Sequence, residues 1–185
     1  SNRIDYIKGD HRFSREKYAK NSNNKRKFIA QWVEKEFRNL CRAKSKGLNV
    51  PRPLLFKENV LVMEMIVEDR DDQARDNNSF VNSPQLKEVD FLPLEKWENC
   101  YEQTLHIVQD LYQKCKLVHA DLSEYNLLLH NKEHVFALDF GQALDTSHPE
   151  HKTYLLRDLE IVNAFFGKKG VQIRDAQEVL ESIVG

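Results

Sequence analysis

Three oxygen-bearing side chains near the middle of the chain have the types and spacing to bind a metal–nucleotide complex. Asp121, Asn126 and Asp139 stand five and thirteen residues apart. The first two lie in a polar run, HADLSEYN, which apolar residues flank on both sides, and Asp139 follows the apolar stretch VFAL. Hard cations such as Mg²⁺ prefer oxygen ligands and need few from the protein when phosphates supply the rest. If the chain returns Asp139 to the polar run, the set suits an ATP–Mg²⁺ site.

The elements around these residues predict such a return. A helix over residues 94–116 carries one apolar face and leads into the polar run. A turn centred on residues 130–134 then joins two short strands, and the second strand is predicted to end at Asp139. This hairpin would bring Asp139 beside Asp121 and Asn126, on loops that a rigid scaffold holds, where catalytic groups are usually found.

The rest of the chain predicts a mixed α+β architecture in two lobes. Gly47 stops the first helix, and Asp175 is the expected cap of the last one. A segment rich in Asp, Arg, Asn and Ser has the composition of a flexible connector and of a lobe boundary. We therefore expect one lobe over residues 1–66 and a second, mostly helical lobe over 67–185. The expected elements are a helix over 25–46, a hairpin over 53–66, the connector over 67–89, a helix over 150–167 and a last helix from about 175.

Composition excludes several classes of function. The 185 residues carry 28 Lys+Arg against 29 Asp+Glu, so no overall charge favours DNA or an acidic membrane. The chain has no apolar run long enough to span a bilayer, and we expect a soluble, cytoplasmic protein without a membrane partner. Cys41, Cys100 and Cys115 show no CxxC spacing and occupy apolar helix positions, which predicts reduced core residues and no zinc site. No glycine-rich phosphate loop is present.

A family resemblance rests on four separated motifs. HADLSEYN followed by LDFG resembles the catalytic loop and the metal motif of protein-kinase-like phosphotransferases, at the intervals of HxDxxxxN and DFG. LVHADLSEYN with DFGQAL and LLRDLEIVNAFF is more similar to the RIO kinases, the RIO1 branch in particular, and YIKGDHRF and WVEKEFRNL fit that branch too. The likeness covers about residues 3–170, and the short DFGQAL version resembles archaeal members. It implies a protein-kinase-like two-lobed α+β fold, in which residues 1–66 are a partial N-lobe and residues 67–185 a mostly helical C-lobe.

The resemblance implies roles for the three oxygen-bearing residues. Asp121 would accept or orient the proton of the attacking hydroxyl or water. Asn126 and Asp139 would hold Mg²⁺ or Mn²⁺ ions that neutralise charge on the phosphoryl group. RIO relatives are thought to pass phosphate transiently to the metal-binding aspartate, which would be Asp139. His119 would pack beneath the loop and hold its shape.

The resemblance also implies an adenine slot. Met63 would lie behind the adenine, the carbonyl of Glu64 and the N–H of Ile66 would bind its edge, and Leu128 would form the floor. Glu36 would pair with a lysine that orients the α- and β-phosphates. Simpler readings stay open: Glu36 could lie on a solvated helix face, and VMEMI could be an ordinary core strand with Glu64 in solvent.

The sequence departs from common protein kinases at several positions. Ala120 replaces the arginine of His-Arg-Asp, and Ser123 stands where a lysine near the γ-phosphate is usual. About ten residues separate Asp139 from the next helix, and no APE motif follows, so an extended peptide has little platform. We therefore expect a poor kinase toward free peptides that hydrolyses ATP or phosphorylates itself.

Family members carry a phosphate-binding loop and a lysine-bearing strand upstream of the segment RIDYIKGD. This sequence starts too late to contain them, so we expect the chain to be part of a longer protein, and Lys8 is not assigned the lysine's role. The resemblance implies a role in maturation of the small ribosomal subunit. A basic cluster near the N-terminus is either a solvated loop or a contact to ribosomal RNA phosphates; its members are Arg12, Arg15, Lys20, Lys25, Arg26 and Lys27.

Two other functions remain open from the sequence. Small-molecule phosphotransferases of the aminoglycoside or choline kinase type also use HxDxxxxN and a later aspartate, although LSEYN and EKEFRNL fit RIO kinases better. A nucleotide-binding scaffold without catalysis is the second alternative, because the phosphate loop is missing. A pure scaffold would have no need of both Asn126 and Asp139.

Overall fold

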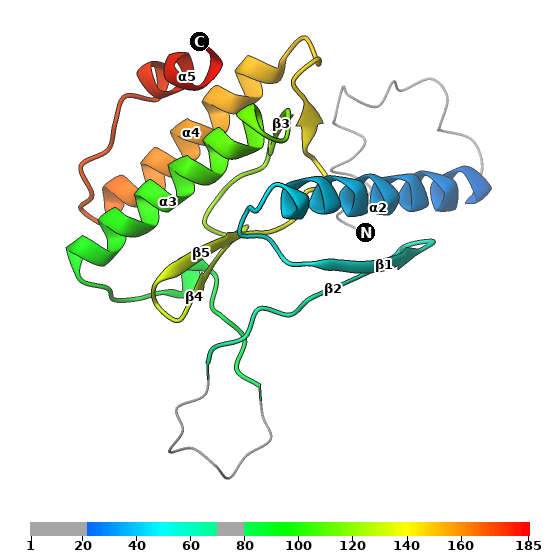
Figure 1. Cartoon of the computed structure of the whole chain (residues 1–185), viewed down its shortest axis with the longest axis horizontal. Helices are drawn as coiled ribbons and strands as arrows, with labels where there is room; N and C mark the ends of the chain where they lie inside the picture. The colour runs from blue at the N-terminus through cyan, green and yellow to red at the C-terminus, as the bar shows by residue number, and fades with distance from the viewer. Residues whose placement is uncertain (1–21, 70–79) are drawn as a thin grey trace.

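The computed structural model describes residues 22–69 and 80–185 as helices that alternate with short antiparallel strand pairs. The elements are α2 (Ser22–Ser45), β1 (Pro53–Lys57), β2 (Val60–Met63), the short 3₁₀ helix η1 (Leu86–Glu88), α3 (Leu94–Gln113), β3 (Leu117–Val118), β4 (Leu127–His130), β5 (His134–Ala137), β6 (Leu144–Asp145), α4 (His151–Lys168) and α5 (Ala176–Val184). Figure 1 shows α3 and α4 side by side in one half of the molecule, and α2 along the β1–β2 hairpin in the other. None of the helices within these ranges combines the length and apolarity that a membrane crossing requires.

The first predicted helix is α2, and its apolar stripe packs against the β1–β2 hairpin. Apolar residues at three-to-four spacing turn one face inward, where Val33 and Leu40 are buried. The rings of Phe37 on α2 and Phe56 on β1 lie 4.9 Å apart between centroids. Gly47 adopts φ +82°, a conformation that glycine reaches without a Cβ clash, so the predicted stop is confirmed.

The β1–β2 hairpin is shorter than the sequence predicts. Its strands pair antiparallel with Lys57 opposite Val60, and β2 ends at Met63. Residues 64–66, which we call the hinge segment, continue outside the strand. The hinge segment is nevertheless attached to β1, because the Glu64 N–H donates to the Arg52 carbonyl at 2.8 Å.

The larger core lies among α3, α4, α5 and the central strands. Tyr101 on α3 and Phe166 on α4 are both buried, with ring centroids 5.3 Å apart. The Tyr101 hydroxyl donates to Asn163 Oδ1 at 2.7 Å and accepts from the Arg174 N–H at 3.0 Å. A buried hydroxyl with both bonds made locks the two long helices to the segment that precedes α5. Asp175 then caps α5, as predicted, by accepting from two backbone N–H groups.

The predicted flexible connector over residues 67–89 is wrong for the parts that the structure describes. Val67 pairs with Asn82 in an isolated bridge, and η1 follows with Leu86 fully buried. A single buried apolar side chain, Leu86, anchors the segment, and one such residue hardly changes its polar composition. Residues 70–79 lie outside the described part of the chain.

The three cysteines are free thiols. Cys100 and Cys115 are buried, as predicted, whereas Cys41 is half-buried. Burial raises the pKa of the Cys100 thiol to about 11. At neutral pH this thiol is therefore protonated and behaves as an apolar core residue.

Candidate active site

Two loops of the C-lobe connect the same two strand pairs and so lie side by side. The catalytic loop (residues 119–126) runs from β3 to β4, and the metal loop (residues 138–143) runs from β5 to β6. Because β3 pairs with β6 and β4 pairs with β5, both ends of one loop are fixed next to the ends of the other. The predicted hairpin turn is confirmed, with His130 opposite His134. The fold therefore brings the loop of Asp139 to the loop of Asp121 and Asn126.

Direct hydrogen bonds join the two loops. The Leu138 N–H donates to the Asn126 carbonyl at 2.8 Å. His119 donates through Nε2 to the Leu138 carbonyl, also at 2.8 Å, and its ring centroid lies 5.0 Å from that of Phe140. His119 is 2% exposed, so it packs beneath the loops as a structural group. Leu138 is held from both sides, which fixes the approach of Asp139 to the catalytic loop.

Asn126 is oriented by its own loop. Its Nδ2 donates to the Asp121 carbonyl at 2.8 Å, and its backbone N–H donates to Ser123 at 2.9 Å. An amide whose nitrogen is engaged in this way presents its oxygen on the opposite side, where it can ligate a cation. The side chain and its neighbour Asp121 are thus held in one rigid unit.

Each loop contains a non-glycine residue in the left-handed region. Ala120 adopts φ +65° and Asp139 adopts φ +58°. Such conformations cost about 1–3 kcal/mol and persist where surrounding contacts hold them. Asp139 Oδ1 accepts from the Gly141 N–H at 3.3 Å, a local bond that favours aspartate in this conformation. The predicted strand therefore ends at Ala137, because a strand cannot continue through a residue with positive φ.

Asp158 on α4 holds the backbone of the catalytic loop. Its two carboxylate oxygens accept from the N–H groups of Ala120 at 2.7 Å and Leu122 at 3.1 Å. Asp158 is 2% exposed, and this burial raises the pKa of its carboxyl to about 6, against the lowering effect of nearby His119 and the two N–H groups. A buried charge with two backbone donors explains how the left-handed residue at 120 is maintained.

One face of α2 contacts the metal loop. Asn39 Nδ2 donates to the Phe140 carbonyl at 3.1 Å. A Cβ on Gly141 would overlap the indole of Trp32, so glycine is needed for α2 to approach this closely. Glu36 lies between these two residues on the same face, one turn from each. Glu36 is half-buried there, which differs from a fully solvated helix face, and its pairing with a lysine stays a prediction.

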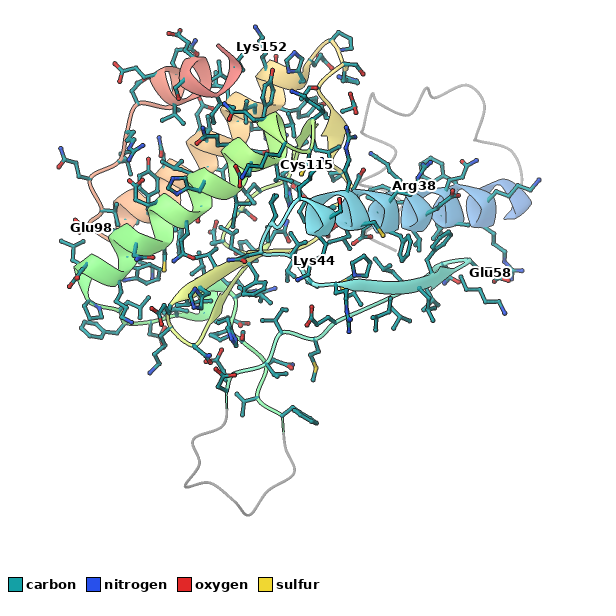
Figure 2. The ribbon with its side chains drawn as sticks, in the orientation of Figure 1. Arg38, Lys44, Glu58, Glu98, Cys115 and Lys152 are labelled. Carbon is teal, nitrogen blue, oxygen red and sulfur yellow. The ribbon has the colours of Figure 1, made fainter. Side chains whose placement is uncertain are left out.

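The C-terminal part of α2 reaches two further regions. Arg42 forms an ion pair with Asp145 on β6 at 3.1 Å, and Asp145 in turn accepts from the Ser147 N–H. Lys44, labelled in Figure 2 where α2 approaches the hairpin, donates to the Val50 carbonyl at 2.9 Å and lies 3.8 Å from Glu64 Oε2. The Ser147 bond and Arg42 lower the pKa of the Asp145 carboxyl. Thus α2 contacts both β6, the strand that follows the metal loop, and the hinge segment.

The residues predicted for the adenine slot lie on connected segments. Ile66 accepts through its carbonyl from the Ser83 N–H at 3.0 Å, and Gln85 pairs with Leu128 in an isolated bridge. Residues 83–85 therefore join the hinge segment to β4, which carries the expected floor. Met63, half-buried, ends β2 directly before the hinge segment. The hinge segment and residues 83–85 thus link the backbone of Met63 to that of Leu128.

The Glu64 side chain does not simply extend into solvent. Its Oε2 accepts from the Arg52 N–H at 3.0 Å, besides its contact with Lys44. This bond turns the side chain back toward Arg52. Glu64 is nevertheless exposed, so the simpler reading, in which its side chain lies in solvent, agrees with the structure, and the adenine slot stays a prediction.

The donor set fits a hard divalent cation. It consists of one amide oxygen, on Asn126, and the carboxylates of Asp121 and Asp139 on the adjacent loops. Among residues 22–69 and 80–185, no three His, Cys, Asp or Glu side chains gather closely enough to hold a metal ion by themselves. A magnesium ion here would take its other ligands from phosphates and water, which is usual for Mg²⁺.

Sequence reasoning missed three contributors to the site. Asp158 stands at a core position between Leu155 and Leu159, and a carboxylate on an apolar helix face needs buried partners. The sequence LLRDLEIV shows this pattern, a carboxylate among apolar helix positions. Asn39 and Trp32 carried no such signal, because their partners are a backbone carbonyl and a glycine from a distant loop.

The sequence of this chain matches one protein family along most of its length. The family model of the RIO domain matches residues 1–179. The chain is 40% identical over 185 residues to serine/threonine-protein kinase RIO3 of Mus musculus, covering all of this chain and 33% of that protein. It is 36% identical over 180 residues to the probable serine/threonine-protein kinase RIO1 homolog of Encephalitozoon cuniculi, covering 97% of this chain and 42% of that protein. The chain thus spans well under half of either relative.

Comparison with solved structures identifies the same fold. The crystal structure of the Rio2 kinase of Chaetomium thermophilum in an ADP/Mg²⁺–phosphoaspartate complex matches with a TM-score of 0.69 at 17% identity. The match covers 95% of this chain and 49% of that one. The predicted protein-kinase-like α+β fold is therefore confirmed. The relatives include the RIO1 branch expected from the sequence and also the RIO3 branch.

Proposed function

The chain belongs to the RIO kinase family, and on that premise we propose that it is the core of an ATP- and Mg²⁺-dependent RIO-type serine protein kinase or ATPase. The single observation that carries the proposal is the pairing of the two loops through Leu138, since it holds the loop of Asp139 against the loop of Asp121 and Asn126. That juxtaposition is the minimum that phosphoryl transfer from ATP needs.

Each of the three residues has a distinct part. Asp121 orients the attacking hydroxyl or water and accepts its proton, an effect that typically contributes about 10²–10⁴-fold to the rate. The Asn126 oxygen and the Asp139 carboxylate hold the cation. When bound, Mg²⁺ supplies charge neutralisation at the phosphates. Ala120 and Leu122, held by Asp158, keep Asp121 in position and so reduce the reorganisation that the reaction requires.

Nucleotide binding is assigned to the connected segments of the hinge and β4. The Glu64 carbonyl and Ile66 N–H would meet the adenine edge, with Met63 behind the ring and Leu128 beneath it. The links between Ile66 and Ser83 and between Gln85 and Leu128 support this role, because they set the spacing between the edge and the floor. Glu36 would pair with a lysine that orients the α- and β-phosphates.

Asp139 is also the proposed acceptor of the phosphoryl group. One of its carboxylate oxygens forms a bond to the γ-phosphorus as the bond from that phosphorus to the β–γ bridging oxygen breaks, and ADP leaves. Water then attacks the phosphorus, releases inorganic phosphate and restores the carboxylate. The phosphoaspartate in the Rio2 complex supports this route by analogy of fold. ³²P-label from [γ-³²P]ATP that hydroxylamine removes, and that Asp139→Asn loses, is the expected result. Rapid phosphorylation of generic peptides would argue against it.

The decisive test of the main proposal compares Asp121→Asn with wild type in the full protein. ATP hydrolysis and self-phosphorylation should fall by about 10²–10⁴-fold. Asp90→Asn, which changes an exposed carboxylate in the segment before α3, is the matched control and should leave both rates as in wild type. Unchanged turnover in Asp121→Asn would remove the catalytic role of Asp121. Phosphate transfer to small alcohols or aminoglycosides, but not to protein, would assign a different substrate class.

The proposal extends to a cytoplasmic role in maturation of the small ribosomal subunit, with pre-ribosomal RNA as a contact. Arg26 and Lys27, the exposed described members of the basic cluster, support it; the side chains of the other members lie outside the described residues. Binding to ribosomal RNA that weakens steeply between 50 and 200 mM salt is expected for phosphate contacts. Binding that salt leaves unchanged would count against the cluster.

A further inference from the structure

One lysine beside the catalytic loop, Lys87, has a fixed backbone and an exposed side chain. Lys87 is the middle residue of η1, whose neighbour Leu86 is fully buried. The Gln85 N–H donates to Glu88 Oε2 at 3.0 Å, and the reciprocal bond completes a capping box around the turn. The backbone at Lys87 is therefore fixed by an apolar anchor and by two local hydrogen bonds.

The position of Lys87 is set against the catalytic loop. Its N–H donates to the Glu124 carbonyl at 3.3 Å, and two residues earlier Gln85 pairs with Leu128. Residues 85–87 thus run along residues 124–128. The ammonium group of Lys87 lies 4.5 Å from the ring centroid of Tyr125, the residue directly before Asn126.

Tyr125 lies on the solvent side of this loop. Its side chain is 54% exposed, whereas the amide of Asn126 turns inward to the Asp121 carbonyl. Tyr125 stands four residues after Asp121, so its ring and the cation above it lie on the solvent side of the loop that carries the catalytic residue. The cation–π contact holds the charge there.

The Lys87 ammonium keeps its hydrogen-bonding capacity for a ligand. Within the described residues it has no carboxylate within ion-pair distance and donates no hydrogen bond, so the face of Tyr125 is its one partner there. Lys169, another lysine above aromatic rings, differs because its Nζ donates to the Val89 carbonyl at 3.1 Å. An ammonium with three free donors beside an active site suits a carboxylate.

We infer that Lys87 and Tyr125 form a recognition site for an acidic side chain, aspartate or glutamate, of the protein that receives the phosphoryl group. The inference rests on the proposed function and adds a substrate class to it. Ser123 occupies the position where common kinases place a lysine, and Lys87 on η1 supplies a positive charge beside this loop.

The test is an NMR titration of the ¹⁵N-labelled full chain in ADP and Mg²⁺. The probes are three peptides that share one serine and carry glutamates, glutamines or lysines around it. Wild type should bind the glutamate peptide best, with shifts centred on the amides of residues 87 and 124–126. Lys87→Ala should reduce the preference for glutamate over glutamine by about 2- to 5-fold, as for an exposed ion pair. Lys87→Glu should reverse the order, so that the lysine peptide binds best.

The control is Lys96→Ala, which removes an exposed lysine whose Nζ bonds to the Lys132 carbonyl away from the catalytic loop. It should keep the wild-type preference. An unchanged preference in Lys87→Glu, or a loss of ADP affinity equal to the loss of peptide affinity, would overturn the inference and assign Lys87 to the nucleotide or to no ligand. Peptide binding needs no turnover, so the two proposals can fail separately. If acidic peptides bind through Lys87 but the protein does not hydrolyse ATP, the recognition site stands and the proposed function is refuted.

Discussion

Replacing Asp158 by asparagine gives opposing effects whose balance depends on pH. The amide has one acceptor oxygen, so one of the N–H groups of Ala120 and Leu122 loses its partner, at a cost of about 1–3 kcal/mol. Burial has raised the pKa of the Asp158 carboxyl from its ordinary 3.8 to about 6. At about 1.4 kcal/mol per pH unit, the charged form lowers the stability of wild type at pH 7 by about 3 kcal/mol relative to a neutral group. Asp158→Asn removes this term, so its net effect at pH 7 should be small.

The pH dependence separates the two effects. Between pH 6 and 3.8 the folded protein binds a proton that the unfolded chain does not, so wild type gains stability as the pH falls through this window. The variant has no carboxyl at 158 and does not gain. The difference in unfolding free energy should therefore shift in favour of wild type by about 2 kcal/mol between pH 7 and pH 4.5. Titrating groups that do not interact with residue 158 are shared and cancel in this difference.

Urea denaturation from pH 4.5 to pH 8, followed by tryptophan fluorescence, measures the difference. The matched control is Asp175→Asn, because Asp175 also accepts from two backbone N–H groups but is exposed at the start of α5. Its difference from wild type should stay small, since asparagine caps helices nearly as well as aspartate. A pH-independent difference for Asp158→Asn would refute the reasoning that burial of its charge opposes folding.

Three further predictions follow from packing. Gly141→Ala should destabilise the protein by about 1–3 kcal/mol in urea, because its methyl group would overlap the indole of Trp32; Gly141→Ala with Trp32→Leu should recover part of the loss, and an additive pair would contradict the contact. Tyr101→Phe should cost about 1–3 kcal/mol, since it leaves a buried amide oxygen and a backbone N–H without their partner, and a change in melting temperature below about 2 °C would contradict this. In a thiol-labelling time course at pH 8, half-buried Cys41 should react first and Cys100 only on unfolding, because burial raises the pKa of the Cys100 thiol to about 11; equal rates would disprove the order.

The elements that the sequence predicted well are those that local chemistry determines. The three-to-four apolar spacing predicted α2, which ends at Ser45, two residues before Gly47. Asp175 was predicted as the cap of the last helix, and it caps α5. The proximity of Asp139 to Asn126 followed from a single hairpin, whose register needed only the turn at residues 131–133. These features depend on residues close together in the sequence.

Features that depend on distant partners were not predictable from one sequence. The bond from Asn39 to Phe140 spans 101 residues, and nothing near Asn39 identifies its partner. The segment at Leu86 has the composition of a loop, yet one buried side chain and a bridge to Leu128 fix it. Polar composition describes average solvation, whereas one anchored apolar residue decides whether such a segment is ordered.

The shared attachment of the catalytic and metal loops has a consequence for how this region unfolds. Since β3 pairs with β6 and β4 with β5, releasing either loop end breaks a ladder on which the other loop also depends. Native-state hydrogen exchange should therefore find the amides of Leu138 and Leu144 opening with one common free energy, as a single cooperative unit. Asp139 and Asp121, which we propose as a metal ligand and as the catalytic group, would then lose their fixed positions together.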